Sequence, residues 1–429
     1  MTGKYIYGID FGTTNSVLAI LDVATNEVVK LFTTPSLLFF PEAQNVKGPV
    51  AYSVGNDAVD RYVESRMQGR FMKSIKRVLP NKSFVDTKIS HQRFKAEDLV
   101  SLILIFLKRQ ADDFLQEDIK TAVLGRPVIF DELPEKDRLA QERLSKAAAL
   151  AGFEQVFFQL EPIGAAYSYE RQIKKAELVL VADFGGGTSD FTIMQLNPDA
   201  VNNPDRSGDM VAKGGIYIGG DNFDADIMWH RGTPHFGRGV KEQFEPGKWL
   251  DLPLTYFSNI CSWEKMNFLD SVKWRNNISK SYLFSGRDYR VKNLQTLIEN
   301  NFGYSLFKQI EQCKFGLTNH NMASFAFEEL DIKIHETISI EDFETEIIHK
   351  NIHKIEVYLK DFLENQKIDL KNINTVFMTG GTAYVRPLRN IFARLFGAEK
   401  LKSGDNFHSV AMGIAYSYNI LSNQRQVKS

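Results

Sequence analysis

The stretch VADFGGGTSDFTIM, residues 181–194, sets Asp183 just ahead of three consecutive glycines, with apolar β-forming residues on both sides. Two runs rich in Val, Ile, Phe and Thr that meet at a glycine turn are typical of a β-hairpin. The stretch IYGIDFGTTNSVLAIL, residues 6–21, has the same layout, with Asp10 just ahead of Gly12 and two threonines. The sequence therefore predicts two similar hairpins in distant parts of one chain.

Turns of this kind are suited to binding phosphate. Backbone N–H groups can converge on an anion where no Cβ obstructs the approach, and threonine hydroxyls add further donors. A carboxylate beside such a turn would repel a bare phosphate unless a divalent cation lay between them. Mg²⁺ favours a few carboxylates together with waters and phosphate oxygens. We therefore expect Asp10 and Asp183 to hold hydrated Mg²⁺ beside a polyphosphate that two lobes clasp from opposite sides.

Each hairpin taken alone is also compatible with an ordinary turn, so the hypothesis depends on the pair. No G-x-x-x-x-G-K-[ST] motif occurs, which excludes a P-loop. The contiguous glycines at 185–187 precede a strand where a dinucleotide fingerprint would begin a helix. A third glycine turn, at residues 378–382, lies between a predicted strand and a predicted helix. It is either a plain connection or a place where the backbone approaches an adenosine or a phosphate.

Length and composition limit the classes of protein that the chain can belong to. Its 429 residues favour two or three domains, and its 43% hydrophobic and 24% charged residues are ordinary for a globular protein. The net charge of −1 gives no support to nucleic-acid binding, and two cysteines, Cys261 and Cys313, are too few for a disulfide framework. No signal peptide is evident, and the longest apolar run, residues 99–107, is too short to span a membrane. We therefore expect a cytoplasmic protein with no nucleic-acid or membrane partner.

Beyond the hairpins, helical and strand patterns alternate along the chain, which implies an α/β fold with mixed or parallel sheets. A strand is predicted at 121–130, and strand, turn and helix at 156–167 and 374–397; helices are predicted at about 97–115, 134–151, 304–317, 342–366 and 409–422. The region at about 225–302 differs, because prolines and glycines interrupt any long period there. We expect an inserted subdomain here. The region also contains all four tryptophans, Trp229, Trp249, Trp263 and Trp274.

Five motifs in a fixed order carry a resemblance to a known family. They are Asp10-Phe11-Gly12-Thr13-Thr14-Asn15-Ser16, Glu161-Pro162 with Gly164-Ala165-Ala166, Asp183-Phe184-Gly185-Gly186-Gly187-Thr188, Gly219-Gly220-Asp221-Asn222-Phe223-Asp224, and Gly380-Gly381-Thr382. The series resembles the nucleotide-binding domain of Hsp70 chaperones, within the actin, sugar kinase and Hsp70 superfamily. Residues 404–413, GDNFHSVAMG, are similar to those of the short bacterial Hsp70 homologues of the YegD type, which lack a substrate-binding domain.

The resemblance implies a fold and a ligand. The fold would be a duplicated, two-lobed actin-like ATPase fold of the α/β class, related to ribonuclease H, with a cleft between the lobes. Lobe I would comprise residues 1–174 and 402–429, and lobe II residues 175–401, including the tryptophan-rich insertion. The cofactors would be ATP or ADP with Mg²⁺, and K⁺ is a further candidate ion. The partner would be a protein that the sequence does not identify.

The resemblance also implies roles for individual residues. Asp10, Asp183 and Asp190 would hold the metal through water. Glu161 would help to position the attacking water, and Lys76 would contact the γ-phosphate, with Lys73 as the rival for that role. Asp183 and Thr188 would also belong to the catalytic set. The nucleotide would contact the following residues: Gly12, Thr13, Thr14, Asn15, Gly185, Gly186, Gly187, Thr188, Gly219, Gly220, Glu311, Lys314, Phe315, Thr318, Gly380, Gly381 and Thr382.

The sequence departs from the family pattern where Phe315 stands in place of an arginine that packs against adenine. A phenylalanine preserves a flat contact with the base but lacks the cationic component. We expect a slow Mg²⁺-dependent ATPase that acts as a nucleotide-gated switch without a peptide-binding domain. Two alternatives stay open from the sequence: a small-molecule kinase of the same superfamily, and a non-catalytic nucleotide-sensing scaffold.

Overall fold

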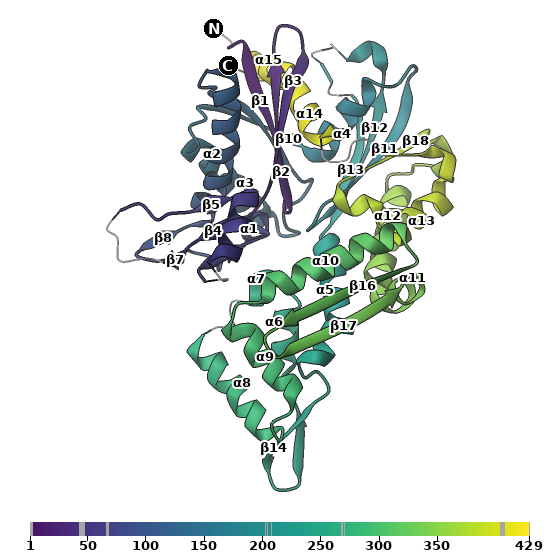
Figure 1. Cartoon of the computed structure of the whole chain (residues 1–429). Helices are drawn as coiled ribbons and strands as arrows, with labels where there is room; N and C mark the ends of the chain where they lie inside the picture. Colours follow the sequence, from purple (N-terminus) through teal and green to yellow (C-terminus); the bar gives the residue numbers. More distant parts are fainter. Residues whose placement is uncertain are drawn as a thin grey trace.

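The structure is a computed structural model that describes residues 3–42, 48–65, 68–201, 203, 205–206, 208–266, 269, 271–403 and 408–428. Two five-stranded sheets form its centre, and they share one strand order and one pattern of strand directions. In each sheet a hairpin is extended by a third antiparallel strand on one side and by two parallel strands on the other. Both predicted hairpins are confirmed, and each begins one copy of a duplicated unit (Figure 1).

The two sheets are built from distant parts of the chain. The first has the order β10-β9-β1-β2-β3: β10 (Gln155–Leu160), β9 (Thr121–Arg126), β1 (Tyr5–Phe11), β2 (Asn15–Asp22) and β3 (Glu27–Pro35). The second has the order β13-β12-β11-β18-β19: β13 (Met210–Ile216), β12 (Ser189–Leu196), β11 (Glu177–Phe184), β18 (Thr375–Thr379) and β19 (Leu401–Ser403).

Successive side chains of a strand point to opposite faces of the sheet and therefore pack into two different hydrophobic layers. In β1, Tyr7 and Ile9 pack against the outer helices of the first sheet, α2 (Ala96–Leu115) and α3 (Pro134–Leu150), whereas Ile6 faces the opposite layer. The second sheet is covered on its outer face by α12 (His349–Asn365) and α13 (Arg386–Phe396). The fold therefore repeats the same helix-on-sheet arrangement in both halves.

Two helices lie between the sheets, α4 (Glu161–Glu170) and α14 (Ser409–Tyr416), and α15 (Tyr418–Lys428) follows them. They cross so closely that a Cβ on Gly413 would lie 1.6 Å from the carbonyl oxygen of Gly164. A Cβ on Gly8 of β1 would lie 2.5 Å from Ala415 of α14. Glycine at these points lets the helices approach each other and the sheet, and this packing fixes where α4 begins, at Glu161.

A small unit branches from the first half between β3 and α2 (Figure 1). It consists of a three-stranded sheet, a helix, a 3₁₀ turn and a short hairpin: β4 (Leu38–Phe40), β5 (Ser53–Val54), β6 (Arg70–Met72), α1 (Gly55–Glu64), η1 (Ile75–Val78), β7 (Thr87–Ile89) and β8 (Gln92–Phe94).

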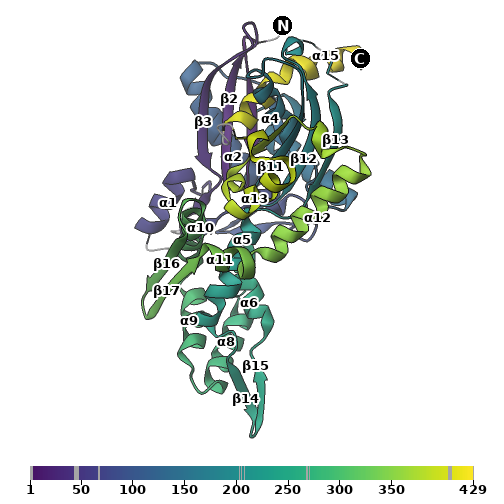
Figure 2. The same cartoon turned by 90° about the vertical axis from the view of Figure 1, so that its right-hand side faces the viewer.

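A larger unit branches from the second half between β13 and α12 and extends away from the sheets (Figures 1 and 2). Its elements are α5 (Gly220–Ile227), a π-helical turn η3 (Met228–Gly232), η4 (Thr233–Phe236), β14 (Lys241–Glu245), β15 (Lys248–Asp251), α6 (Leu254–Ile260), α7 (Trp263–Met266), α8 (Val272–Phe284), α9 (Tyr289–Glu299), α10 (Gly303–Asn319), β16 (Met322–Glu329), β17 (Ile332–Ser339) and α11 (Ile340–Asp342).

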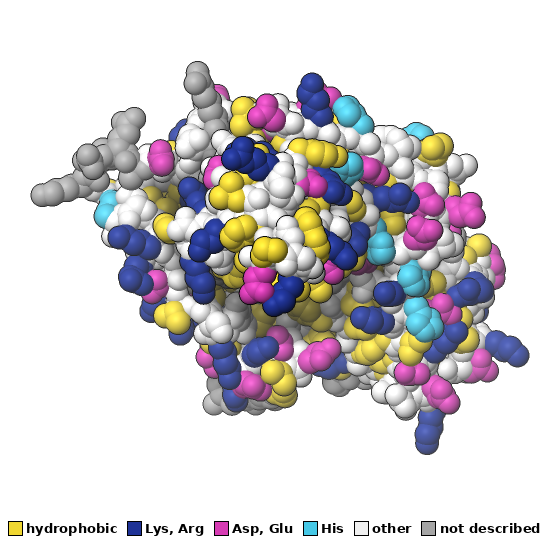
Figure 3. Space-filling model, turned by 90° about the horizontal axis from the view of Figure 1, so that it is seen from below, with side chains coloured by type: hydrophobic (Ala, Val, Ile, Leu, Met, Phe, Trp, Pro, Cys, Tyr) yellow, Lys and Arg dark blue, Asp and Glu magenta, His cyan; other side chains and the backbone are white. Residues whose placement is uncertain are grey.

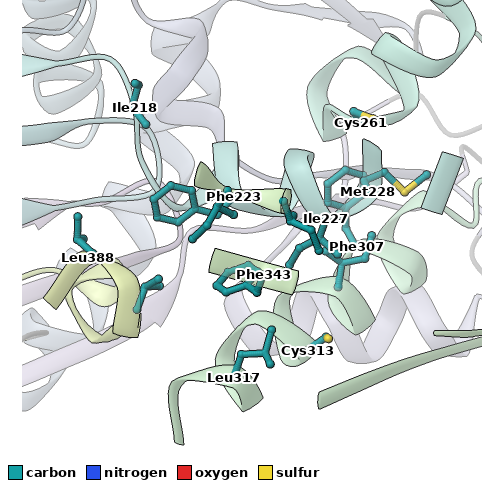
Figure 4. Packing of buried hydrophobic residues seen from close by; sticks show 14 of the residues in the cluster. Ile218, Phe223, Ile227, Met228, Cys261, Phe307, Cys313, Leu317, Phe343 and Leu388 are labelled. Carbon is teal, nitrogen blue, oxygen red and sulfur yellow. The ribbon is translucent and has the colours of Figure 1, made fainter. Parts of the chain in front are cut away.

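The interior of this larger unit is continuous with the core of the second half. Phe223 and Ile227 of α5 lie among Phe307 and Cys313 of α10 and Phe343 (Figure 4). All five side chains are buried in one hydrophobic cluster that also includes strand and helix residues of the second sheet. A movement of α10 would therefore be transmitted to α5 through packed side chains.

The structure differs from the secondary-structure predictions at several points. The helix predicted at about 409–422 is divided at Ser417 into α14 and α15. The predicted helix at 342–366 is interrupted, because α11 gives way to a π-helical turn η6 (Phe343–Ile347) before α12 begins. The hairpin of β16 and β17 was not anticipated, although Phe325 and Ile334 belong to an alternating pattern with one buried face. No helix in the described part of the chain is long and apolar enough to span a membrane.

Candidate functional site

A single cleft between the two halves contains nearly all the residues that the sequence analysis selected. From the first half and α4 they are Asp10, Gly12, Thr13, Thr14, Asn15, Lys76 and Glu161. From the second half and its larger unit they are Asp183, Gly185, Gly186, Gly187, Thr188, Gly220, Glu311, Lys314, Phe315, Gly380, Gly381 and Thr382. Segments that are far apart in sequence therefore meet around one space.

The glycine turn after β11 has its carbonyl groups engaged and its N–H groups available. The carbonyl of Gly185 accepts hydrogen bonds from the Gly220 N–H at 3.0 Å and the Thr382 hydroxyl at 3.0 Å. The carbonyl of Gly186 accepts from the Asp221 N–H at 2.8 Å. In the part of the chain that the structure describes, no group accepts a hydrogen bond from the Gly186 or Gly187 N–H. These N–H groups line the cleft, which is the arrangement that binds an anion.

The third glycine turn is fixed against the second. Gly380 has a φ of +84°, and a Cβ there would lie 2.3 Å from the carbonyl oxygen of Phe184. Only glycine fits this close approach of two backbones. Gly381 and Thr382 line the cleft as a result, whereas Gly219 lies just behind it, packed against Gly186.

Three aspartates and Glu161 gather where the turns converge. Burial, reinforced by Glu161 and opposed by Lys76, raises the pKa of Asp10 to about 7. Burial also raises the pKa of Asp190 to about 7, although Thr188 and the Val128 N–H donate hydrogen bonds to its carboxylate at 2.9 and 3.0 Å. The acidic groups outnumber Lys76, the lysine that lies among them.

The pKa of Asp183 is shifted in the same direction. Burial raises its pKa well above the usual value, and the neighbouring Glu161, Asp190 and Asp10 raise it in that order of importance. Asp183 of β11 lies opposite Asp190 of β12 in the strand register, so the second hairpin brings two of the acidic groups together. Such clusters are stabilised when a cation binds among the carboxylates.

Lys76 and Lys73 lie in different environments. The Lys76 ammonium donates to Glu161 Oε1 at 2.7 Å, and both side chains are about nine-tenths buried in the cleft. Burial lowers the pKa of Lys76, but Glu161 and Asp10 outweigh it, so that its pKa is raised. Lys73 instead pairs with Glu311 of α10 at 2.9 Å and lines an adjoining cavity. The geometry therefore favours Lys76 over Lys73 for contact with a bound phosphate.

The residues fit a hydrated magnesium ion better than a directly ligated one. Among the described residues, no three His, Cys, Asp or Glu side chains converge closely enough to bind a metal directly. Mg²⁺ characteristically keeps several waters and takes few protein ligands when phosphate oxygens complete its shell. Buried carboxylates with raised pKa values beside unpaired N–H groups match that donor set, and Asp10 and Asp183 line the cleft where they would hold the ion through water. Asp190 does not line the cleft, and its two carboxylate oxygens accept hydrogen bonds from Thr188 and Val128, so it would support the ion from behind Asp183.

The helix α10 forms the other wall of the cleft. Lys314 donates to Asp224 of α5 at 2.8 Å, and burial raises the pKa of Asp224 to about 6 against the opposing effect of Lys314. Phe315 is 61% exposed and lines both the cleft and the adjoining cavity, so its ring is free to stack on a planar ligand. Thr318, at the end of α10, does not line the cleft. Residues 404–407 of the GDNFHSVAMG segment lie outside the described residues.

Arg77, Tyr217 and Asp221 are among the cleft residues that the sequence analysis missed. Arg77 pairs with Asp221 at 3.3 Å across the cleft, and its guanidinium lies 5.6 Å from the centre of the Tyr217 ring. Ser74, just ahead of η1, has a φ of 57°, a conformation that is uncommon for a residue with a side chain. Arg77 adjoins Lys76 and Asp221 adjoins Gly220, so proximity to selected residues was the only signal available.

Comparisons with known proteins identify the fold. The model of the Hsp70 protein family matches residues 6–238 and 293–429. The chain is 24% identical over 431 aligned residues to the chaperone protein DnaK of Mycoplasmopsis synoviae, covering 98% of this chain and 59% of that one. It is 26% identical to DnaK of Thermosipho melanesiensis, over 98% of this chain and 60% of that one. DnaK of Thermosipho africanus is 33% identical over 52% of this chain.

Almost the entire chain aligns with the first two of these DnaK proteins. It spans about three fifths of their length. The family model covers both sheets and the cleft between them, and the duplicated strand order agrees with it. The expected two-lobed fold is confirmed by this match. The chain belongs to the Hsp70 family and has the actin-like ATPase fold of that family's nucleotide-binding domain.

Proposed function

We propose that residues 1–429 bind ATP with Mg²⁺ in the cleft and hydrolyse it to ADP and phosphate. The observation that carries the proposal is the meeting of two glycine turns around Asp10, Asp183 and the Lys76–Glu161 pair.

In this proposal the two turns hold the phosphates from opposite sides. The N–H groups of Gly186 and Gly187 and the hydroxyl of Thr13 donate to phosphate oxygens, and Thr188, whose hydroxyl donates to Asp190, lines the same space. A magnesium ion, held through water by Asp10 and Asp183 with Asp190 behind them, would supply charge neutralisation on the phosphates. Phosphoryl transfer needs mainly positioning and electrostatic stabilisation, and these donors and charges are fixed before the substrate arrives.

Lys76 and Glu161 are the groups that we assign to the attacking water. Glu161 accepts a hydrogen bond from that water and so aims its lone pair at the γ-phosphorus. Lys76, which Glu161 orients, donates to a γ-phosphate oxygen and stabilises the negative charge that develops there. Because the pair is nearly buried, its hydrogen bonds act in a medium that screens them weakly.

We further propose that the nucleotide state controls contact with a protein partner. The support is structural: α10 touches the cleft through Glu311, Lys314 and Phe315, and it packs into the core of the larger unit. A base bound against α10 would therefore favour one position of that unit. K⁺ beside Asp190 is a further proposal, which the acidity of the site supports.

Calorimetry and product analysis test the proposal together. ATP and ADP should bind in the presence of Mg²⁺, and EDTA should weaken that binding strongly. ADP should accumulate from ATP with no added acceptor, whereas a kinase would require a small-molecule substrate such as a sugar. Asp183→Asn should reduce Mg²⁺-dependent binding or turnover at least about tenfold. Binding and turnover that were indifferent to both EDTA and Asp183→Asn would exclude the model, and binding without ADP formation would favour the scaffold.

A further inference from the structure

Residues 239–292 lie outside the match to the Hsp70 family model. They form β14, β15, α6, α7, α8 and the start of α9, at the end of the molecule farthest from the two sheets (Figures 1 and 2). None of the described residues among them lines the nucleotide cleft. This segment therefore departs from the family model, and its own surface needs an explanation.

The segment is unusually rich in exposed apolar side chains. Among the described residues, 21 large hydrophobic side chains are exposed, and eight of them lie here: Phe244, Trp249, Leu250, Leu254, Val272, Leu283, Phe284 and Tyr289. Seen from this end of the molecule, hydrophobic side chains gather together with lysines and arginines between them (Figure 3). Scattered exposed hydrophobics are normal, but a concentration of them marks an interaction surface.

The hairpin of β14 and β15 presents apolar groups on both of its faces. Leu250 lies opposite Glu242 and Trp249 opposite Gln243, so successive side chains of β15 point to opposite faces. Trp249 is 54% exposed and Leu250 is 57% exposed. On the α8 side, Phe244 packs against Phe284, with ring centroids 4.9 Å apart.

Basic charge accompanies the apolar groups. The segment contains nine Lys and Arg against six Asp and Glu, a net charge of +3 in a chain whose net charge is −1. Lys273 and Lys280 are seven residues apart on α8, and Phe284 follows Lys280 by four, so all three share one helix face. Neither lysine forms an ion pair with a described residue. Two exposed, unpaired lysines therefore lie on the same face of α8 as Phe284, which packs against Phe244.

The outer edge of β15 is open. The sheet has only two strands, α8 packs beside β14, and all four residues of β15 are exposed. Within the described ranges, no backbone group pairs with this outer edge. An exposed strand edge with apolar groups on both faces is a template for one more strand.

We propose that this surface binds an extended segment of a partner protein, in which acidic residues alternate with apolar ones, by strand addition to β15. We call it the tip surface, and it consists of Phe244, Trp249, Leu250, Lys273, Lys280 and Phe284. Because successive side chains of a strand point to opposite faces, the apolar side chains of the added strand contact Trp249 on one face. Its carboxylates lie on the other face, that of Leu250, and are directed toward the lysines of α8.

The same features disfavour two other occupants. A lipid bilayer would leave the open strand edge without hydrogen-bond partners in hydrocarbon, which is costly. A second copy of the chain would bring two segments of net positive charge together, and like charges across an interface are unfavourable. An acidic strand satisfies the backbone edge and the lysines at once.

Fluorescence anisotropy with short labelled peptides tests the proposal without nucleotide, so it can fail independently of the proposed ATPase function. The probe is a peptide of about six residues, a typical strand length, in which aspartate alternates with leucine and phenylalanine. A peptide with lysine in place of aspartate is its charge control. The aspartate peptide should bind saturably, and amide hydrogen exchange should slow in residues 248–251.

Variants locate the binding. Leu250→Asp and Lys280→Glu should each lower the affinity for the aspartate peptide at least about fivefold, because each substitution places a negative charge opposite the carboxylates of the peptide. Leu330→Asp and Lys88→Glu, at other exposed positions, should leave binding unchanged. Failure to saturate at millimolar peptide, equal affinity for the lysine peptide, or indifference to Leu250→Asp would overturn the proposal. It is equally overturned if Leu250→Asp abolishes binding to phosphatidylserine vesicles or self-association in sedimentation, because either result would assign the surface to a different occupant.

Discussion

Lys76 is buried in the cleft, yet its pKa is raised because the carboxylates of Glu161 and Asp10 outweigh the effect of burial. A charge fixed in this way needs no reorganisation when negative charge develops on the γ-phosphate. We expect Lys76→Ala to lower kcat about a hundredfold or more and to change the affinity for ATP much less, since the lost interaction forms chiefly in the transition state. Single-turnover hydrolysis and calorimetry measure the two effects separately.

Lys73→Ala is the matched control, because Lys73 pairs with Glu311 instead and lies in the adjoining cavity. The rate constant of hydrolysis in Lys73→Ala should stay within about threefold of that of the unaltered protein. This change is much smaller than the one expected when a donor to the transition state is lost. If Lys73→Ala abolished hydrolysis and Lys76→Ala did not, the assignment of the two lysines would be reversed.

The acidic cluster predicts that binding of ATP with Mg²⁺ depends on pH. The pKa values of Asp10 and Asp190 are about 7, and that of Asp183 is also raised, so the empty site holds protons at neutral pH that a cation must displace. Calorimetry at pH 7 in buffers of different ionisation enthalpy should therefore show proton release, and the affinity should rise between pH 6 and 8. A binding enthalpy that did not vary with the buffer would contradict this prediction.

The sign for stability is the opposite one. Raised pKa values mean that the folded protein holds protons which the unfolded chain releases above about pH 4, so the cluster's contribution to stability is lost as pH rises through 7. The Asp190→Asn variant should release fewer protons when ATP and Mg²⁺ bind. In its nucleotide-free form, the free energy of unfolding should also fall less steeply as pH rises. Urea denaturation across pH 5 to 8 measures this contribution.

The site residues that could be predicted are those whose role is visible in a short stretch. A carboxylate, glycines and threonines in one turn, repeated elsewhere, indicate phosphate and metal without any knowledge of the fold. Arg77 and Tyr217 could not be found in this way, because they become cleft residues only when distant segments meet. Thr318 was placed in the cleft by resemblance, but it lies one turn beyond Lys314, outside the lining.

The crossing of α4 and α14 is the tightest helix contact that the glycines reveal. Gly413→Ala would place a methyl group 1.6 Å from the Gly164 carbonyl oxygen, so one helix must shift. We expect a loss of about 1–3 kcal/mol in the free energy of unfolding, as for other overpacked sites, measured by urea denaturation. Because α4 begins at Glu161, the shift should also displace the Lys76–Glu161 pair and slow hydrolysis.

Gly48→Ala is a suitable control for that substitution, since nothing lies within 4 Å of a Cβ at that position. Its unfolding free energy should stay within about 0.5 kcal/mol of that of the unaltered protein, as for most surface substitutions. Equal stability of the two variants would mean that the helices can separate without cost.

Elements with strong local signals were predictable, and those that depend on partners were not. The helix at α3 begins at Pro134 and ends just before Gly152, the residue types that favour these positions. The β16–β17 hairpin was missed because its alternation is short and its apolar face is buried only by α10. The π-helical turn η6 adds a residue to one helical turn, and nothing in the local sequence distinguishes it from a continuous helix.

The duplication organises the entire chain, because two copies of one sheet put two equivalent turns face to face. The repeated Asp-Phe-Gly stretch could predict this, since each copy carries its own hairpin. The boundaries of the lobes at 174, 175, 401 and 402 stay a prediction. The tip surface had no such signal in the sequence: its tryptophans suggested an insertion, but exposure and an open strand edge are properties of the folded chain alone.

The connection between the cleft and the larger unit leads to the last prediction, which concerns its tryptophans. Lys314 and Phe315 line the cleft from α10, and Lys314 pairs with Asp224 of α5. Trp229 follows α5 in the π-helical turn η3, where the Arg238 guanidinium lies 5.0 Å from its ring. If nucleotide moves α10, α5 should follow, and the surroundings of Trp229 should change. ATP and ADP should then give different tryptophan emission spectra.

Variants separate this mechanism from a rigid insertion. Phe315→Ala should shrink the spectral difference by removing a contact with the base, and Trp229→Phe should abolish most of it. Trp249→Phe is the control and should preserve the difference, since Trp249 is already exposed at the far hairpin and does not line the cleft. Large aromatic side chains in a core often serve packing alone. Identical spectra of the nucleotide-free, ADP-bound and ATP-bound protein, at concentrations that calorimetry shows to saturate, would mean that this unit does not report the nucleotide state.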